Sequence, residues 1–385
     1  MSKLGTIALM GGSLPYWGAH ESAVLRRISD CQTLRMGGNV LICDQGHREV
    51  HYNSCRDRHC PLCQGVARTQ WVKDRLTELL PCPYFHVVFT VPHELMTVAL
   101  ANKRIFYRAL FLCAHESLLA VFGNPENLGA RVGGLSVLHT WNQKLAYHPH
   151  LHCIVPGGGV SPDGTKWIAG TPGFLVSVKR LSSMFRGKFL GLLKKQLKKG
   201  KLAGDAANTQ RALCRASAKA FVVYAKKPFG GPEQVLKYLG RYTHRVGISE
   251  QRILSYENNQ VKFSWLDRKN GQTRKIMTLT LEEFLKKFML HLLPKAFRKI
   301  RYFGFMGNRH RRASIHKVRL LINPAAKTVD PKNSIPPKEP KTCTKCGQPL
   351  SVHSRFEKSY FKVSNLQGIR AHGPEPSEKV TECRY

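Results

Sequence analysis

Three histidines alternate with other residues over residues 148–152, which read His-Pro-His-Leu-His. Side chains of an extended strand point alternately to its two faces, so His148, His150 and His152 share one face. Leu151 and Cys153 then point the other way, toward a core. Three imidazoles on one face suggest a divalent metal held by neutral nitrogen ligands. The pattern therefore predicts a strand with one core face and one metal-binding face.

A second motif, YLGRYTHR, occupies residues 238–245. The preceding Pro232 is typical of a first helical turn, so we expect a helix from there to about residue 244. Gln234, Tyr238 and Tyr242 are spaced by four residues and would share one face of it. An adjacent stripe carries Lys237, Arg241 and Arg245. Taken alone, this pattern is explained better by a surface helix whose tyrosines only pack. Beside a metal, the two hydroxyls would suit attack on a phosphodiester.

Eight of the twelve cysteines lie near the two ends of the chain. No signal-peptide pattern precedes them, so metal binding explains them better than a disulfide framework. Zinc favours four Cys or His ligands in a tetrahedron, and a Cys-x2-Cys pair is a common source of two of them. The tidiest predicted set is Cys43, Cys55, Cys60 and Cys63. Cys31, His47 and His59 could replace one of these ligands or belong to a second zinc site.

A second Cys-x2-Cys pair, Cys343 and Cys346, lies close to the C-terminus. By spacing alone it is half of a zinc knuckle. Cys383 together with His353 or His372 could complete a site there.

The charge of the chain indicates a polyanionic partner. Its 61 Lys and Arg residues against 24 Asp and Glu give a formal charge of +37, and DNA is the partner that fits such an excess. A membrane fits less well, because no apolar run approaches the roughly 18 residues that a span requires. We therefore expect a cytoplasmic DNA-binding protein.

The order of predicted elements indicates an α+β fold built on an antiparallel sheet. Residues 85–91 and 134–141 have the β-branched and aromatic composition of strands, and residues 94–122 are apolar at helical spacing. Thr280 and Glu283 form a predicted capping box at the start of a later helix. The predicted divisions are a zinc-binding domain (1–78), a catalytic domain (79–320), a linker rich in Pro and Lys (321–342) and a tail (343–385).

The motifs together resemble one family. Residues 139–159, HTWNQKLAYHPHLHCIVPGGG, are similar to the HUH motif (His-hydrophobe-His) of rolling-circle transposases, and YLGRYTHR is similar to their two-tyrosine motif. Residues 52–64, YNSCRDRHCPLCQ, resemble the zinc-binding segment of the same group. The likeness is to the two-tyrosine HUH transposases of the insertion-sequence-ninety-one family, and it covers about residues 25–315. Where that family has a Cys-x2-Cys ahead of this segment, the chain reads Cys43-Asp-Gln-Gly-His47.

The resemblance implies an HUH-type sheet and metal-dependent nicking and joining of single-stranded DNA. His150 and His152 would bind Mg²⁺ or Mn²⁺. Gln234 is the preferred third ligand and His148 its rival. Tyr238 or Tyr242 would attack the DNA and leave a 5′-phosphotyrosine, while the basic stripe beside them would contact phosphates. Zinc would be structural.

Three other functions are open to a chain of this kind. A replication initiator or relaxase would use the same chemistry, but the chain has no Gly-x4-Gly-Lys-[Ser/Thr] loop of a fused helicase. A non-catalytic zinc-dependent DNA-binding protein would explain the charge and the cysteines, but not the rows of histidine and tyrosine. A transposase with an acidic triad is disfavoured by the scarcity of carboxylates.

Overall fold

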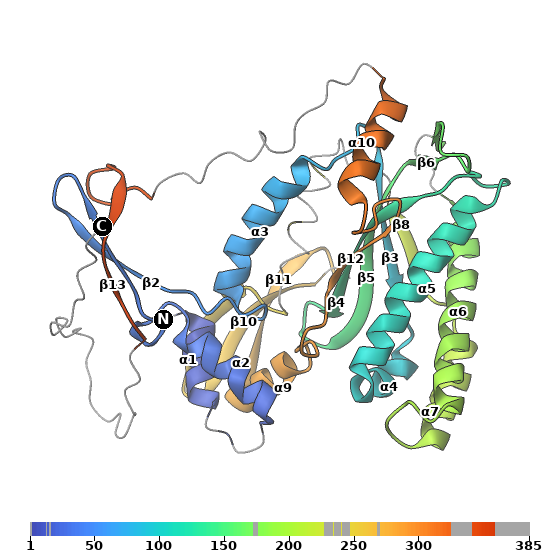
Figure 1. The fold of residues 1–385 in the computed structure, drawn as a ribbon. Helices are drawn as coiled ribbons and strands as arrows, with labels where there is room; N and C mark the ends of the chain where they lie inside the picture. The colour runs from blue at the N-terminus through green and yellow to red at the C-terminus, as the bar shows by residue number, and fades with distance from the viewer. Residues whose placement is uncertain are drawn as a thin grey trace.

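The computed structural model describes residues 2–12, 14, 17–171, 176–226, 234, 240, 247–267, 270–324 and 341–358. Helices and antiparallel sheets are both present, which confirms the predicted α+β class (Figure 1).

A five-stranded sheet forms the centre of the molecule, with strand order β12-β4-β5-β3-β8 and antiparallel pairing throughout. Its strands are β3 (Tyr84–Thr90), β4 (Gly133–Trp141), β5 (Tyr147–Pro156), β8 (Val223–Lys226) and β12 (Ile300–Gly304). The strand predicted from the three histidines is β5. Leu151, Cys153 and Val155 point into the main core, as their alternation with the histidines predicts.

Helices cover the face of this sheet that carries Leu151 and Cys153 (Figure 1). They are α4 (Met96–Ala101), α5 (Lys103–Gly123), α6 (Val178–Lys198) and α7 (Ala206–Ser217). By length and composition α5 could cross a membrane. Its Phe106, Leu110 and Phe111 are instead completely buried, so α5 is the core helix of this layer.

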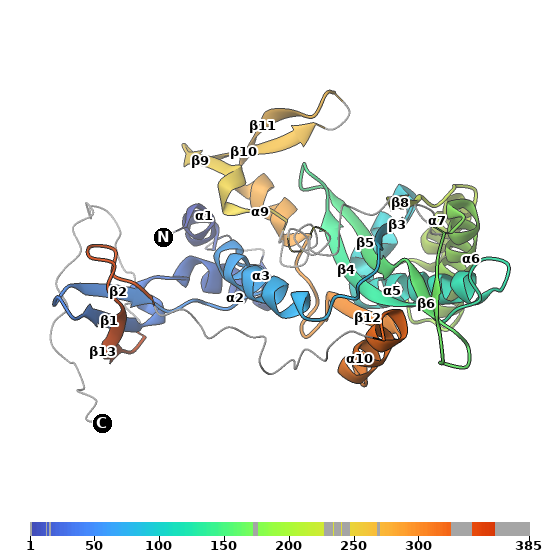
Figure 2. The same ribbon diagram turned by 90° about the horizontal axis from the view of Figure 1, so that it is seen from above.

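The N-terminal helices share a second core with a distant part of the chain. Helices α1 (Lys3–Gly11) and α2 (Ala19–Asp30) pack with α9 (Leu281–Met289) and with a three-stranded sheet. That sheet consists of β9 (Ile253–Glu257), β10 (Gln260–Asp267) and β11 (Thr273–Thr280), and it stands apart from the five-stranded sheet (Figure 2). The capping box predicted at Thr280 is present at the start of α9. The predicted domain boundaries stay predictions.

A third sheet joins the two ends of the chain. Its order is β13-β1-β2, and its strands are β1 (Gly38–Cys43), β2 (Arg48–Tyr52) and β13 (Leu350–Phe356). Figure 2 shows these strands together at one end of the molecule. The remaining α-helices and strands are α3 (Pro61–Leu76), the small hairpin of β6 (Gly158–Val160) and β7 (Trp167–Ala169), and α10 (Arg311–Ile322). Ile315 and Val318 of α10 pack against the second face of the five-stranded sheet.

Candidate active site and zinc clusters

Three histidines converge on the face of the five-stranded sheet opposite α5. His139 of β4 lies directly across from His150 of β5 in the antiparallel register, and His152 follows two residues later on the same face. One nitrogen atom from each of the three lies within 4.8 Å of the others. The hairpin of β4 and β5 therefore assembles a three-imidazole cluster from two strands.

Hydrogen bonds fix the orientation of the two β5 rings. The Nδ1 of His150 donates to the carbonyl oxygen of His148 at 2.7 Å, so the lone pair of His150 is on Nε2. The Nδ1 of His152 lies 2.8 Å from the Nε2 of His86, on the neighbouring strand β3. A hydrogen bond to the second ring nitrogen orients a histidine for metal binding through the first.

The Nε2 atoms of His150 and His152 face each other and are 3.1 Å apart. Two nitrogen ligands at 2.1 Å from one cation are about 3.0 Å apart at an octahedral angle and about 3.4 Å apart at a tetrahedral one. The observed separation lies between these two values and is compatible with one cation held by both rings. Burial also lowers the pKa of His150 to about 4, so its imidazole is neutral near pH 7. The cluster thus suits a divalent cation with further positions open to oxygen ligands.

His139 is the member of the cluster that the sequence analysis did not select. The sequence contains a signal for it: a short polar turn joins the two predicted strands, and this turn places residue 139 opposite residue 150. The imidazole of His148, a predicted rival ligand, is not part of the cluster; its backbone carbonyl orients His150 instead. Gln234 is an exposed helical residue, and its role as a metal ligand stays a prediction.

The two tyrosines and the basic stripe lie outside the described residues. This applies to Tyr238, Tyr242, Lys237, Arg241 and Arg245. Within the motif, Gly240 is described: it is helical and buried. A β-carbon on Gly240 would lie 2.5 Å from Cγ2 of Val72 in α3, so the middle of the two-tyrosine motif packs closely against that helix.

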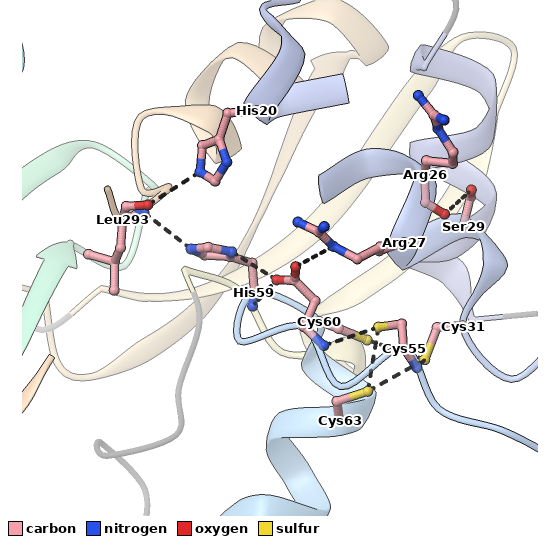
Figure 3. A network of polar contacts seen from close by, with 11 residues as sticks. His20, Arg26, Arg27, Ser29, Cys31, Cys55, His59, Cys60, Cys63 and Leu293 are labelled. Atoms are coloured by element: carbon pink, nitrogen blue, oxygen red, sulfur yellow. Dashed lines mark hydrogen bonds and ion pairs between the residues drawn. The ribbon is translucent and has the colours of Figure 1, made fainter. Parts of the chain in front are cut away.

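A cluster of four cysteines stands at the start of α3 (Figure 3). Cys60 is the N-cap residue of this helix, and Cys63 lies in its first turn. The Sγ atom of Cys63 is 3.6 Å from those of Cys31 and Cys55, and the sulfurs of Cys31 and Cys60 are also 3.6 Å apart. Sulfurs bound to one zinc at 2.3 Å are about 3.8 Å apart, so these residues fit a closed tetrahedral site.

The grouping differs from the predicted zinc set in one position. Cys55, Cys60 and Cys63 lie together, but the fourth member is Cys31, and Cys43 belongs to a separate cluster with His47, Cys343 and Cys346. The reason is topological. Cys31 directly follows α2, and its sulfur lies 3.6 Å from those of Cys60 and Cys63 at the start of α3, whereas Cys43 is at the far end of β1.

His59, a further predicted substitute, is engaged by other partners (Figure 3). Its Nδ1 lies 2.9 Å from Asp57, and its Nε2 accepts a hydrogen bond from the backbone N–H of Leu293 at 3.1 Å. Asp57 also pairs with Arg27 at 2.8 Å. The loop between Cys55 and Cys60 thereby attaches the zinc-binding segment to the chain that leads from α9 to β12.

Comparison with known proteins assigns the family. Residues 13–91 match the family model "Transposase zinc-binding domain", and residues 133–314 match the model "Putative transposase". The "Putative transposase y4qJ" of Sinorhizobium fredii (strain NBRC 101917 / NGR234) is 49% identical over 311 residues, which cover 78% of this chain and 78% of that protein. The chain belongs to the IS91 (insertion-sequence-ninety-one) family of transposases. The resemblance stated from the sequence motifs is confirmed.

Other relatives of this IS91-family transposase are more distant. The transposase for insertion sequence element IS801 of Pseudomonas savastanoi pv. phaseolicola is 29% identical over 341 residues, which cover 85% of this chain and 82% of that protein. Among solved structures, the conjugative relaxase TrwC in complex with oriT DNA aligns with a TM-score of 0.23 and 13% identity, over 41% of this chain and 68% of that one. That likeness is too weak to support a shared fold or function.

Proposed function

We propose that the chain is a rolling-circle transposase that nicks and joins single-stranded DNA through a 5′-phosphotyrosine intermediate. The observation that carries this proposal is the cluster of His139, His150 and His152 in a chain of this family. A zinc-dependent DNA-binding protein without catalysis would need no second, imidazole-only cluster with oriented Nε2 atoms.

His139, His150 and His152 would hold Mg²⁺ or Mn²⁺. When bound, the cation polarises the scissile phosphate and stabilises the oxygen that leaves. The residues of the chain contribute orientation: the His148 carbonyl and the His86 ring hold the two β5 imidazoles with Nε2 facing inward. Gln234 is the alternative to His139 as the third ligand.

Tyr238 or Tyr242 supplies the nucleophile. Its hydroxyl loses a proton, its oxygen forms a bond to phosphorus, and the bond from phosphorus to the 3′ oxygen breaks. The departing 3′ oxygen takes up a proton, so the products are a 5′-phosphotyrosine and a free 3′-hydroxyl. The number of phosphodiester-type bonds is unchanged, so a later 3′-hydroxyl can reverse the step and join strands without ATP. The second tyrosine allows a target strand to be cut while the first still holds the transposon end.

The charge and the zinc site support DNA as the substrate. A formal charge of +37 favours binding to phosphates, and Lys237, Arg241 and Arg245 are the residues we expect to contact them near the tyrosines. Zinc held by Cys31, Cys55, Cys60 and Cys63 would be structural, because four protein ligands leave no open position. We place this activity in the cytoplasm, where the transposon DNA is.

The test of this function is a nicking assay on single-stranded DNA that carries the end of the element. With Mg²⁺ or Mn²⁺ the purified protein is expected to release a 3′-hydroxyl fragment and to retain the other fragment through a denaturing gel as a covalent adduct. EDTA should prevent both products. Tight DNA binding without any nick or adduct in either metal would favour the non-catalytic alternative.

The packing of Gly240 on α3 leads to a prediction in the same assay. Gly240→Val places a branched side chain against Val72, which would displace Gly240 and with it the neighbouring residues Tyr238 and Tyr242. A displacement of about 1 Å can cost about 100-fold in rate, so we expect at least a tenfold loss of adduct formation. The second substitution Val72→Ala removes the opposing methyl groups, so the double variant should recover much of the lost adduct formation.

Gly191→Val is the matched control for this prediction. Gly191 is also a helical glycine, in α6, but no atom lies within 4 Å of where its β-carbon would be. This variant should nick at the wild-type rate. Equal losses in both variants, or no recovery with Val72→Ala, would mean that the contact does not position the nucleophile.

A further inference from the structure

The small sheet β13-β1-β2 buries few apolar side chains; among its described strand residues these are Leu41 and Cys43. Within the described part of the chain, none of its residues belongs to any of the hydrophobic clusters. Most side chains of β2 and β13 are exposed or half exposed, including Val50 and Val352 at more than half of their full exposure. A small sheet with so few buried apolar side chains is only marginally stable on hydrogen bonds, and a structural metal is one device that stabilises such a unit.

Two tight turns face each other at one end of this sheet. In the first, the N–H of Gly46 donates to the carbonyl oxygen of Cys43 at 2.8 Å, and Gly46 has a positive φ of 74°. In the second, the N–H of Gly347 donates to the carbonyl oxygen of Cys343 at 2.8 Å, and Gly347 has a φ of 75°. Each turn thus brings two potential ligands of the chain to one side, the arrangement of a zinc knuckle.

The four side chains of these turns converge on one point. The Sγ of Cys43 lies 3.6 Å from the Sγ of Cys346 and 3.6 Å from the Nδ1 of His47, which is 3.8 Å from the Sγ of Cys343. A sulfur at 2.3 Å and a nitrogen at 2.05 Å from one zinc are about 3.6 Å apart in a tetrahedron. Cys43 and Cys343 are only 4% and 3% exposed, so their sulfurs point inward.

We propose that Cys43, His47, Cys343 and Cys346 form a second, structural zinc site assembled from both ends of the chain. The site is closed, because all four tetrahedral positions are filled by protein ligands. Its role is to fasten β13 onto the hairpin of β1 and β2, so that the C-terminal strand completes the N-terminal zinc-binding region. The zinc compensates for the few buried apolar side chains of this sheet.

Contacts around the cluster fit a permanent attachment. The carboxylate of Glu49 in β2 accepts hydrogen bonds from the backbone N–H and the hydroxyl of Thr344, at 2.6 Å and 2.7 Å. The ring of Tyr52 meets the ring of Phe356 edge to face, with centroids 6.0 Å apart. Each of these pairs joins a residue of the N-terminal hairpin to one of the C-terminal segment, as the zinc ligands do.

Zinc content distinguishes this arrangement from a single-site protein. The full-length wild type is expected to contain two zinc ions per chain, and Cys343→Ser/Cys346→Ser to contain one. The remaining zinc of the first cluster shows that the variant is folded around that site. Cys214→Ser, which removes an exposed cysteine in α7, should keep two. A conservative exchange, His47→Cys, should also keep two, whereas His47→Ala should not.

Fragment retention tests the role of the site. A specific protease sequence inserted into the full chain after residue 332 allows the C-terminal part to be cut from the rest. In the wild-type background the cut fragment should co-elute with the body of the protein under native conditions, and in Cys343→Ser/Cys346→Ser it should separate. One zinc in the wild type, two in the double variant, or retention of the fragment in that variant would each overturn the proposal.

Discussion

Replacing both Tyr238 and Tyr242 by phenylalanine is expected to abolish the covalent protein–DNA adduct. The substitution removes two hydroxyl groups and little else, so binding to the charged backbone should change by less than about twofold. Loss of an essential nucleophile costs at least about 1,000-fold in enzymes that use one. The measurement is a denaturing gel of labelled single-stranded DNA after incubation with Mg²⁺ or Mn²⁺, together with a binding titration of the same DNA.

The single variants, Tyr238→Phe and Tyr242→Phe, show which tyrosine makes the first cut. If one tyrosine makes the first cut, its Phe variant should lose the initial adduct while the other variant retains it and fails only in joining to a target. Tyr224→Phe is the matched control, because Tyr224 is 54% exposed on β8 and outside the motif. An adduct in the double variant would show that the nucleophile is a different residue.

Removing imidazoles from the three-histidine cluster is expected to have the second large effect. His150→Ala and His152→Ala each delete a proposed ligand, and the Nε2 atoms of these two residues are 3.1 Å apart. Both variants should lower metal-dependent nicking by at least about 100-fold. The loss should be partly recovered at high Mn²⁺ concentration, because the defect is one of metal affinity. The readouts are the nicking rate as a function of Mn²⁺ and direct titration of the metal.

The third ligand is decided by comparing three further variants in the same titration. If His139 completes the site, His139→Ala should raise the Mn²⁺ concentration needed for nicking far more than Gln234→Ala or His148→Ala. A larger increase in the Mn²⁺ requirement for Gln234→Ala than for His139→Ala would assign the third ligand to Gln234. His316→Ala, an exposed histidine on α10, should leave the titration unchanged.

Replacement of His86 separates orientation from ligation. Its Nε2 lies 2.8 Å from the Nδ1 of His152 and not at the centre of the cluster, so its effect should be smaller than that of a ligand, about 10-fold to 100-fold in metal affinity. We therefore expect His86 to act through the orientation of the His152 ring.

The local parts of the site could be predicted because strand and knuckle geometry are properties of short segments. Alternation alone gave β5 its core face of Leu151 and Cys153 and its opposite face of His150 and His152. The Cys-x2-Cys spacing likewise predicted that Cys60 and Cys63 share one site. In each case the ligands are two or three residues apart, so the backbone of a single element fixes their separation.

The partners of these local pairs depended on the tertiary structure. His139 joins the histidine cluster through the register of β4 and β5. The folded chain brings Cys31, at the end of α2, to Cys60 and Cys63 at the start of α3, and it brings Cys43 to Cys343 and Cys346 across the sheet β13-β1-β2. A metal site requires atoms within about 4 Å of one another, and sequence separation does not limit that distance between residues of different elements. The sequence by itself indicated the family and two or three members of each cluster, and only the folded chain decided which residues complete them.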